Sequence, residues 1–96
     1  MKKSKLEKAY HDYLAAERCV ACGSSPVTIH HVRSFAGVNA GIGTRSSHYL
    51  AIPLCPECHQ GQNGIHHNKR IFEMRFGTET ELVSKTIENL WRYKNV

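Results

Sequence analysis

Four cysteines arranged as two C-x-x-C pairs constrain this chain more than any other feature of its sequence. The pairs are Cys19 with Cys22 and Cys55 with Cys58, and 32 residues separate them. Each pair can form a knuckle whose two sulfurs face one metal ion, and two knuckles complete the closed tetrahedral shell of a structural zinc site. Because a chain of 96 residues buries little apolar surface, such a metal would contribute directly to folding.

Paired cysteines also occur in redox centres, disulfides and iron–sulfur clusters. The N-terminal segment is too rich in charged residues for a secretory signal, and no run approaches the roughly 20 apolar residues of a membrane span. We therefore expect a cytoplasmic protein without a membrane partner. In that reducing compartment C-x-x-C pairs more often bind metal than form disulfides, so zinc is the preferred interpretation.

The apolar pattern predicts an α+β chain with helices at both ends. Residues 3–17 and 79–94 carry apolar side chains at helical spacing, and a capping box at Thr78 precedes the second of these segments. A short helix capped by Asn68 should end at Gly77. The side chains expected in the core from these helices are Leu6, Ala9, Tyr10, Tyr13, Leu14, Ile71, Phe72, Met74, Phe76, Leu82, Val83, Ile87, Leu90 and Trp91.

Two short strands are expected beside the cysteine pairs. Residues 27–32 and 49–54 suit strands, and the glycine-rich residues 34–48 between them are predicted to form a loop of a length that is usually functional. A zinc ion held by both knuckles would fasten the strands side by side. Residues 1–96 are expected to form one domain, with the knuckles and the core over residues 19–76.

Seven histidines are many for a chain of this length. His11 stands alone on the first helix and is interpreted as a surface residue or a satisfied core residue. The others, near the strands and cysteines, are His30, His31, His48, His59, His66 and His67. A divalent ion on two or three neutral imidazoles can bind a phosphate oxygen, and a further imidazole can take a proton from water near neutral pH. This group predicts a catalytic metal site, or else a second zinc site without catalysis.

Adjacent positions in a strand normally face opposite sides of the sheet. If His30 and His31 both serve one site, we therefore expect a twist or a bulge between them.

The order of these motifs resembles the HNH endonucleases of the His-Me finger class. The likeness is carried by the first cysteine pair, by residues 29–32 and by residues 52–59. The likeness extends over about residues 10–76. Within this class the chain is similar to the phage recombination-enhancement nucleases, which are described as RecA-dependent, and to small prophage proteins. The resemblance implies a zinc-stabilised ββα-metal fold in a bacterial host, a catalytic divalent metal such as Mg²⁺, Mn²⁺ or Zn²⁺, single- or double-stranded DNA as substrate, and a RecA-type filament as a partner.

The resemblance also implies a role for each histidine. His30 would be a metal ligand, His31 the general base, and His59 the next ligand. The asparagine of the HNH name has no counterpart, since Leu50 stands at its position, and His48 is the polar residue nearby.

The last metal ligand has two candidates. Family spacing places it at Asn63, whereas the imidazole of His66 is the better ligand for most transition metals. Gly61 and Gly64 disfavour a continuous helix, so we expect the chain to bend and carry His66 back towards His59.

The net charge favours an anionic partner. It is formally +5 at pH 7, and the isoelectric point is about 9.2, so nucleic acid is the expected class. Candidate phosphate contacts beside the histidines are Arg33, Arg45, Lys69 and Arg70. The sequence thus predicts a metal-dependent endonuclease that hydrolyses phosphodiester bonds of DNA. The alternative is a zinc-dependent nucleic-acid-binding module without catalysis.

Overall fold

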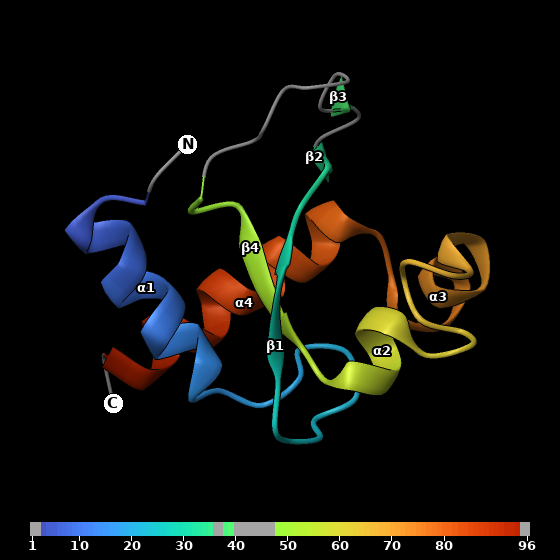
Figure 1. The fold of residues 1–96 in the computed structure, drawn as a ribbon, viewed down its shortest axis with the longest axis horizontal. Helices are drawn as coiled ribbons and strands as arrows, with labels where there is room; N and C mark the ends of the chain where they lie inside the picture. The colour runs from blue at the N-terminus through green and yellow to red at the C-terminus, as the bar shows by residue number, and fades with distance from the viewer. Residues whose placement is uncertain (1–2, 36–37, 40–47, 95–96) are drawn as a thin grey trace.

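The computed structural model describes residues 3–35, 38–39 and 48–94, and a pair of antiparallel strands lies at its centre (Figure 1). Strand β1 (Thr28–His31) pairs with β4 (Ala51–Leu54), so that His30 lies opposite Ile52. The expected strand pair is confirmed, although both strands are shorter than predicted. The register runs without a bulge, contrary to the expectation for a shared site, so His30 and His31 leave β1 on opposite faces.

Helices pack around this strand pair. Helix α1 (Lys5–Ala15) and the short α2 (Pro56–Gln60) each contact both strands, while the long α4 (Glu79–Lys94) packs against β4. Helix α3 (Lys69–Phe76) joins α2 to α4 in the chain and lies on the side of the strands away from α1 (Figure 1). The fold is a small α+β arrangement, as predicted.

Helix ends follow their capping residues. Asn68 Oδ1 accepts the N–H of Ile71 at the start of α3, which ends at Gly77 with φ of +106°. Thr78 and Glu81 form the predicted capping box before α4. These local hydrogen bonds explain why the predicted bounds of α3 and α4 are confirmed. Helix α1 lies two residues inside the predicted range at each end, after the N-cap Ser4.

The core lies around β4 and includes three of the four cysteines. Its buried members are Cys19, Val20, Val32, Ile52, Leu54, Cys55, Cys58, Ile65, Phe72, Leu82 and Val83. The prediction is wrong for Leu6, Met74, Ile87 and Trp91, which are more than half exposed, and for Ala9, which is also exposed. A sheet of two strands is too narrow to cover the full apolar stripes of α1 and α4, which pack against it, so the outer part of each of these two stripes stays in water.

Part of the predicted loop forms a second small sheet. Strand β2 (Ser34–Phe35) pairs antiparallel with β3 (Val38–Asn39), so the prediction of a loop throughout residues 34–48 is wrong there. Arg45 lies outside the described residues. No helix in the described part of the chain is long and apolar enough to cross a membrane.

Candidate metal centres

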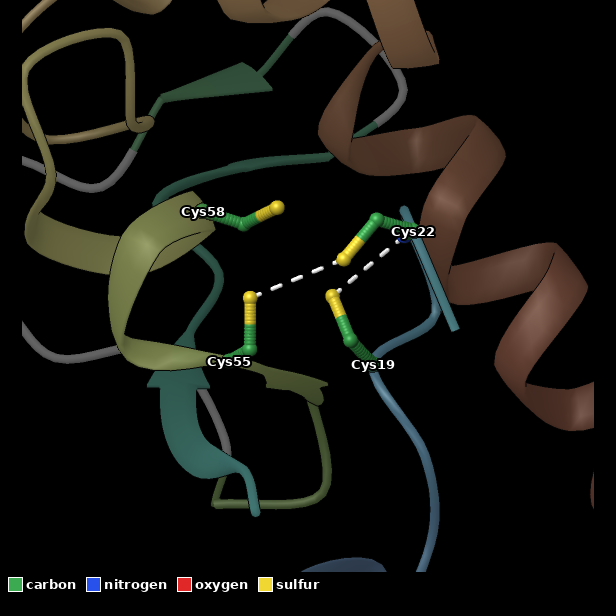
Figure 2. Close-up of side chains that lie close together, drawn as sticks. All are labelled: Cys19, Cys22, Cys55 and Cys58. Atoms are coloured by element: carbon green, nitrogen blue, oxygen red, sulfur yellow. Dashed lines mark hydrogen bonds between the residues drawn. The ribbon is translucent and has the colours of Figure 1, made fainter. Parts of the chain in front are cut away.

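Four sulfur atoms converge where the first cysteine pair meets the start of α2 (Figure 2). The Sγ atoms of Cys19, Cys22, Cys55 and Cys58 all lie within 4.8 Å of one another. Those of Cys22 and Cys55 are 3.6 Å apart. Four thiolates at about 2.3 Å from a tetrahedral zinc ion would be about 3.8 Å from one another. This cysteine centre could therefore hold a structural metal such as zinc, as predicted.

Local turns build both halves of the cysteine centre. The N–H of Cys22 donates to Cys19 Sγ at 3.4 Å, and Gly23 follows with φ of +82°, a conformation that glycine adopts without strain. The N–H of Val20 donates to the carbonyl oxygen of Pro53 at 2.9 Å, which ties this knuckle to β4. In the second knuckle Pro56 begins α2, where a missing N–H costs little.

The cysteine centre is suited to a cation. Burial raises the pKa of the Cys58 thiol above its usual range, and the neighbouring thiols act in the same direction. A hydrogen bond with Ser24 lowers the pKa of the more exposed Cys22 to about 6. Several thiolates cannot crowd together without a compensating charge, and a bound metal ion supplies it.

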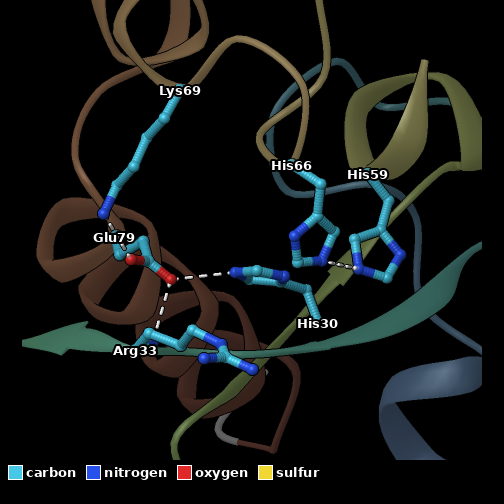
Figure 3. Close-up of polar contacts among 6 residues, drawn as sticks. All are labelled: His30, Arg33, His59, His66, Lys69 and Glu79. Atoms are coloured by element: carbon cyan, nitrogen blue, oxygen red, sulfur yellow. Dashed lines mark hydrogen bonds and ion pairs between the residues drawn. The ribbon is translucent and has the colours of Figure 1, made fainter. Parts of the chain in front are cut away.

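A second group of ligands surrounds His30 (Figure 3). His30 comes from β1, His59 from α2, and His66 from the turn after α2. One ring nitrogen of each lies within 4.8 Å of the other two, and the Nε2 atoms of His59 and His66 are 2.9 Å apart. The structure thus brings together the three histidines that were expected to hold the catalytic metal, and we call them the histidine centre.

A bend after α2 carries His66 back to His59. The helix ends at Gln60, and the N–H of His66 donates to the carbonyl oxygen of His59 at 3.2 Å. Gly64 is required in this bend, because a Cβ there would lie 2.7 Å from the carbonyl oxygen of Glu57. The predicted bend is confirmed. Asn63, the other candidate for the last ligand, lines a cavity beside the cysteine centre instead.

Hydrogen bonds leave one ring nitrogen of His59 available to a metal. Its Nδ1 lies 2.8 Å from Thr28 Oγ1. That hydroxyl gives its proton to the carbonyl oxygen of Leu54 at 3.0 Å, so it accepts from His59 Nδ1–H. The lone pair of His59 is therefore on Nε2, the atom that faces His66.

His30 is held in a similar way from the opposite side. Its Nε2 lies 2.8 Å from the carboxylate oxygen Oε2 of Glu79, which can only accept, so this nitrogen carries the proton. The other nitrogen, Nδ1, is buried and has no hydrogen-bond partner. An unpartnered buried nitrogen beside two further imidazoles fits a metal ligand.

The surroundings keep two of these imidazoles neutral at pH 7. Burial lowers the pKa of His59 to about 4, and the neighbouring His30 and His66 act in the same direction. Burial also lowers the pKa of His66, and the neighbouring His30 and Arg33 lower it further. A neutral ring is the form that can bind a metal ion.

Sequence reasoning missed Glu79, the first residue of α4. It is 2% exposed, and its carboxylate accepts hydrogen bonds from His30 Nε2 and, at 3.1 Å, from the N–H of Arg33, while Lys69 Nζ lies 3.2 Å away. Burial alone would raise the pKa of Glu79, but hydrogen bonds from His30, Arg33 and Lys69 outweigh it and hold the pKa at about 2. The available signal was its spacing, because Glu79 precedes Leu82 and Val83 by three and four residues and so shares their buried face.

His31 lies in a separate histidine group on the other face of β1. Its Nε2 is 3.3 Å from Nδ1 of His48, and one ring nitrogen each of His11, His31 and His48 lies within 4.8 Å of the other two. The structure therefore groups His31 with His48 and not with the three histidines of the histidine centre.

His11 is buried, and both of its ring nitrogens have partners. Nε2 lies 2.6 Å from the carbonyl oxygen of His48, and Nδ1 lies 3.3 Å from Lys3 Nζ. Of the two alternatives expected for His11, a surface residue or a satisfied core residue, the structure shows the second, but His11 does not stand alone, because it belongs to the group with His31 and His48. The hydrogen bond of His11 to the carbonyl oxygen of His48 holds the segment before β4 against α1. Sequence reasoning did not foresee this contact.

Two of the predicted phosphate contacts lie beside the histidine centre. Arg33 follows β1 and Lys69 begins α3, and both contact Glu79 (Figure 3). Arg70 is exposed on α3. Cationic side chains therefore border the histidine centre.

Comparison with known proteins identifies the family. The chain is similar to the uncharacterized protein YdfU of Escherichia coli strain K12, with 25% identity over 83 residues, which are 86% of this chain and 22% of YdfU. This chain thus spans less than a quarter of the length of that relative. No solved structure gives a significant match. The family model described as "Protein of unknown function (DUF968)" matches residues 1–92, and the chain therefore belongs to the DUF968 family.

Proposed function

We propose that this protein is a metal-dependent endonuclease of the HNH type that hydrolyses phosphodiester bonds of DNA. The observation that carries the proposal is the histidine centre, in which Nδ1 of His30 is buried without a partner beside the ring nitrogens of His59 and His66. Three imidazoles can bind a divalent ion and leave positions open for substrate. The chain order β1, β4, α2 supports a ββα-metal arrangement.

The donor set also favours some metals over others. Imidazole nitrogen suits zinc and other transition metals, whereas Mg²⁺ prefers oxygen ligands. Of the three metals implied by the resemblance, Zn²⁺ therefore suits the three imidazoles of the histidine centre best. When bound there, such an ion would stabilise negative charge on the phosphate and on the leaving 3′ oxygen.

The residues around the centre would divide the remaining work. Arg33 and Lys69 would bind phosphate oxygens and position the strand. His31 would accept a proton from water while the water oxygen bonds to phosphorus, the bond from phosphorus to the 3′ oxygen breaks, and that oxygen takes a proton from solvent. His48, whose Nδ1 lies 3.3 Å from His31 Nε2, would orient the ring of His31.

The proposed reaction would use two neighbouring histidines of β1 that point to opposite faces of the strand. In the described part of the chain, β1 has β4 on one edge and no strand on the other. We infer that the phosphate binds along that edge, between the face that carries His30 and the face that carries His31.

The cellular setting is part of the proposal. We infer a bacterial cytoplasm, where thiols stay reduced and the cysteine centre can bind zinc. DNA is the proposed partner, favoured by the net charge of +5. A RecA-type filament is a further proposed partner on the resemblance alone.

A plasmid-nicking assay tests the proposal. The zinc-loaded chain should convert supercoiled plasmid to nicked and linear forms when Mn²⁺, Zn²⁺ or Mg²⁺ is added. Without an added divalent metal, the plasmid should stay supercoiled. The variant His59→Ala should bind plasmid without cutting it. Plasmid binding without cleavage under any added metal would instead favour the zinc-dependent binding module.

The bend after α2 predicts which variants lose the added metal. His66→Ala should lower the affinity for a second divalent ion by more than about a hundredfold, because it removes a direct ligand. Asn63→Ala and His67→Ala should leave that affinity unchanged, since Asn63 lines the cavity beside the cysteine centre and His67 is not one of the three grouped histidines. Calorimetric titration of the zinc-loaded variants with Mn²⁺ measures this. A loss confined to Asn63→Ala would contradict the assignment of His66.

DNA affinity should depend steeply on salt. Three phosphate contacts, from Arg33, Lys69 and Arg70, would lower affinity about 40-fold between about 50 and 200 mM salt through counterion release. Fluorescence anisotropy with a labelled duplex measures the slope. Arg33→Gln should reduce the logarithmic slope by about one, whereas the control Arg92→Gln, on the exposed surface of α4, should not. An affinity that does not change with salt would exclude nucleic acid as the partner.

A further inference from the structure

We propose that Glu79 is a positioning residue for the histidine centre: its carboxylate holds Nε2–H of His30 and thereby directs Nδ1 of His30 to the metal. The inference deepens the proposed function, because it takes the histidine centre to bind a divalent ion. Glu79 itself does not contact that ion or the substrate.

The contacts of Glu79 fix its carboxylate from several sides. Oε2 accepts both from His30 Nε2 at 2.8 Å and from the N–H of Arg33 at 3.1 Å, and Oε1 lies 3.2 Å from Lys69 Nζ. His30 belongs to β1, Arg33 lies two residues after His31 at the end of that strand, and Lys69 begins α3. A carboxylate held in this way cannot rotate freely, so it fixes both the plane and the tautomer of the His30 ring.

This tautomer leaves the correct atom for a ligand. A neutral imidazole carries its proton on one nitrogen and its lone pair on the other. With Nε2 protonated and turned to Glu79, the lone pair lies on Nδ1, which is buried and has no hydrogen-bond partner. The rings of His59 and His66 lie 5.1 and 5.0 Å from the His30 ring, measured between centroids. The buried nitrogen thus belongs to the histidine centre and needs a partner there.

The charge of Glu79 has a second effect. An imidazole that binds a metal ion contributes no negative charge, so three imidazoles do not balance a divalent cation, and a carboxylate behind a ligand makes its ring a stronger electron donor. His59 gives an internal comparison, because its outer nitrogen bonds the uncharged hydroxyl of Thr28. A hydrogen bond orients each ring, but of these two rings only His30 bonds a charged side chain through its outer nitrogen.

Glu79 could instead serve only to attach α4 to β1. A buried carboxylate with several donors would stabilise the fold whether or not a metal binds. The two roles differ in what a charge-neutral substitution changes: positioning predicts weaker metal binding by a chain that is still folded, whereas a purely structural role predicts lower stability with unchanged metal affinity.

Cobalt(II) titration of the zinc-loaded chain separates these roles. Visible absorption reports cobalt at the histidine centre, and an intense near-ultraviolet thiolate band appears only if cobalt displaces zinc from the cysteine centre. Glu79→Gln keeps an oxygen acceptor for His30 and removes the charge, and it should weaken cobalt binding about tenfold. Glu79→Ala removes both and should weaken binding about a hundredfold.

Glu88→Gln is the matched control, since it makes the same chemical change at an exposed position of α4. It should bind cobalt as the unmodified chain does. Circular dichroism of every sample reports whether the chain is folded, and if Glu79→Ala does not fold, the comparison of Glu79→Gln with Glu88→Gln decides.

Two results would overturn the inference, and they are distinguishable. If the unmodified chain binds cobalt at the histidine centre and folded Glu79→Gln binds it equally well, Glu79 is structural and the proposed metal site stands. If the unmodified chain binds no cobalt there, the inference fails together with the metal site of the proposed function.

Discussion

Cys55→Ser should remove most of the folding stability of the chain. Cys55 is 6% exposed and belongs to the buried core, and its Sγ lies 3.6 Å from that of Cys22. A structural zinc site contributes an apparent binding free energy of about 10–16 kcal/mol, which matches or exceeds the total stability of a typical domain, about 5–15 kcal/mol. A site with three thiolates loses much of that energy. Far-ultraviolet circular dichroism and thermal melting measure the effect.

The unmodified chain in strong chelator provides the matched control. It should melt at or slightly below the temperature of Cys55→Ser, because chelator removes the metal whereas the variant keeps three thiolates, and chelator should lower the melting temperature of the variant only slightly. If Cys55→Ser keeps the native helix signal and melting temperature in strong chelator, the cysteine centre does not depend on zinc. A redox or disulfide role would then be the better interpretation of the two pairs.

The elements that the sequence predicted well are those with local causes. The bounds of α3 and α4 follow from Asn68, Gly77 and the capping box at Thr78, whose partners lie within a few residues. The bend after α2 follows from Gly61 and Gly64 in the same way. Strands β2 and β3 have two residues each, too few to show a pattern, and were therefore missed.

Contacts between distant residues account for the errors at the site. His11 meets His48 across 37 residues, and Glu79 meets His30 across 49. Nothing in the local pattern around His11 or Glu79 indicates which residue lies opposite once the chain is folded. The exposure of Ile87 and Trp91 has a similar origin, because helical spacing predicts a common face but not how much of it another element covers.

The positions of His30 and His31 depend both on a local pattern and on contacts between distant residues. The doublet and the strand could be read from the sequence, and strand alternation correctly raised the question of whether both rings serve one site. The answer depends on the unbroken register with β4, which places one ring in each histidine group. The ligand role of His30 is therefore better supported by the geometry than the role of His31 as a base.

His31→Gln should slow DNA cleavage by at least about a hundredfold, the usual contribution of a general base. Glutamine is chosen because His31 is partly buried against His11 and His48, with ring centroids 5.2 and 5.4 Å away, so that alanine would leave a gap. Glutamine can still form a hydrogen bond to His48 but cannot take a proton near neutral pH. Single-turnover cleavage at saturating metal measures the chemical step.

Comparison with the Glu79 variant distinguishes a base from a residue that supports metal binding. His31 lies outside the histidine centre, so His31→Gln should bind cobalt and DNA normally and remain slow at any metal concentration. Glu79→Gln should instead be slow only at low metal and recover as the centre fills. The control His67→Gln changes an exposed histidine and should cut at the normal rate. Full activity of His31→Gln would exclude His31 as the base, and a loss of metal affinity in place of rate would assign His31 to a metal site with His11 and His48, the two histidines that it faces.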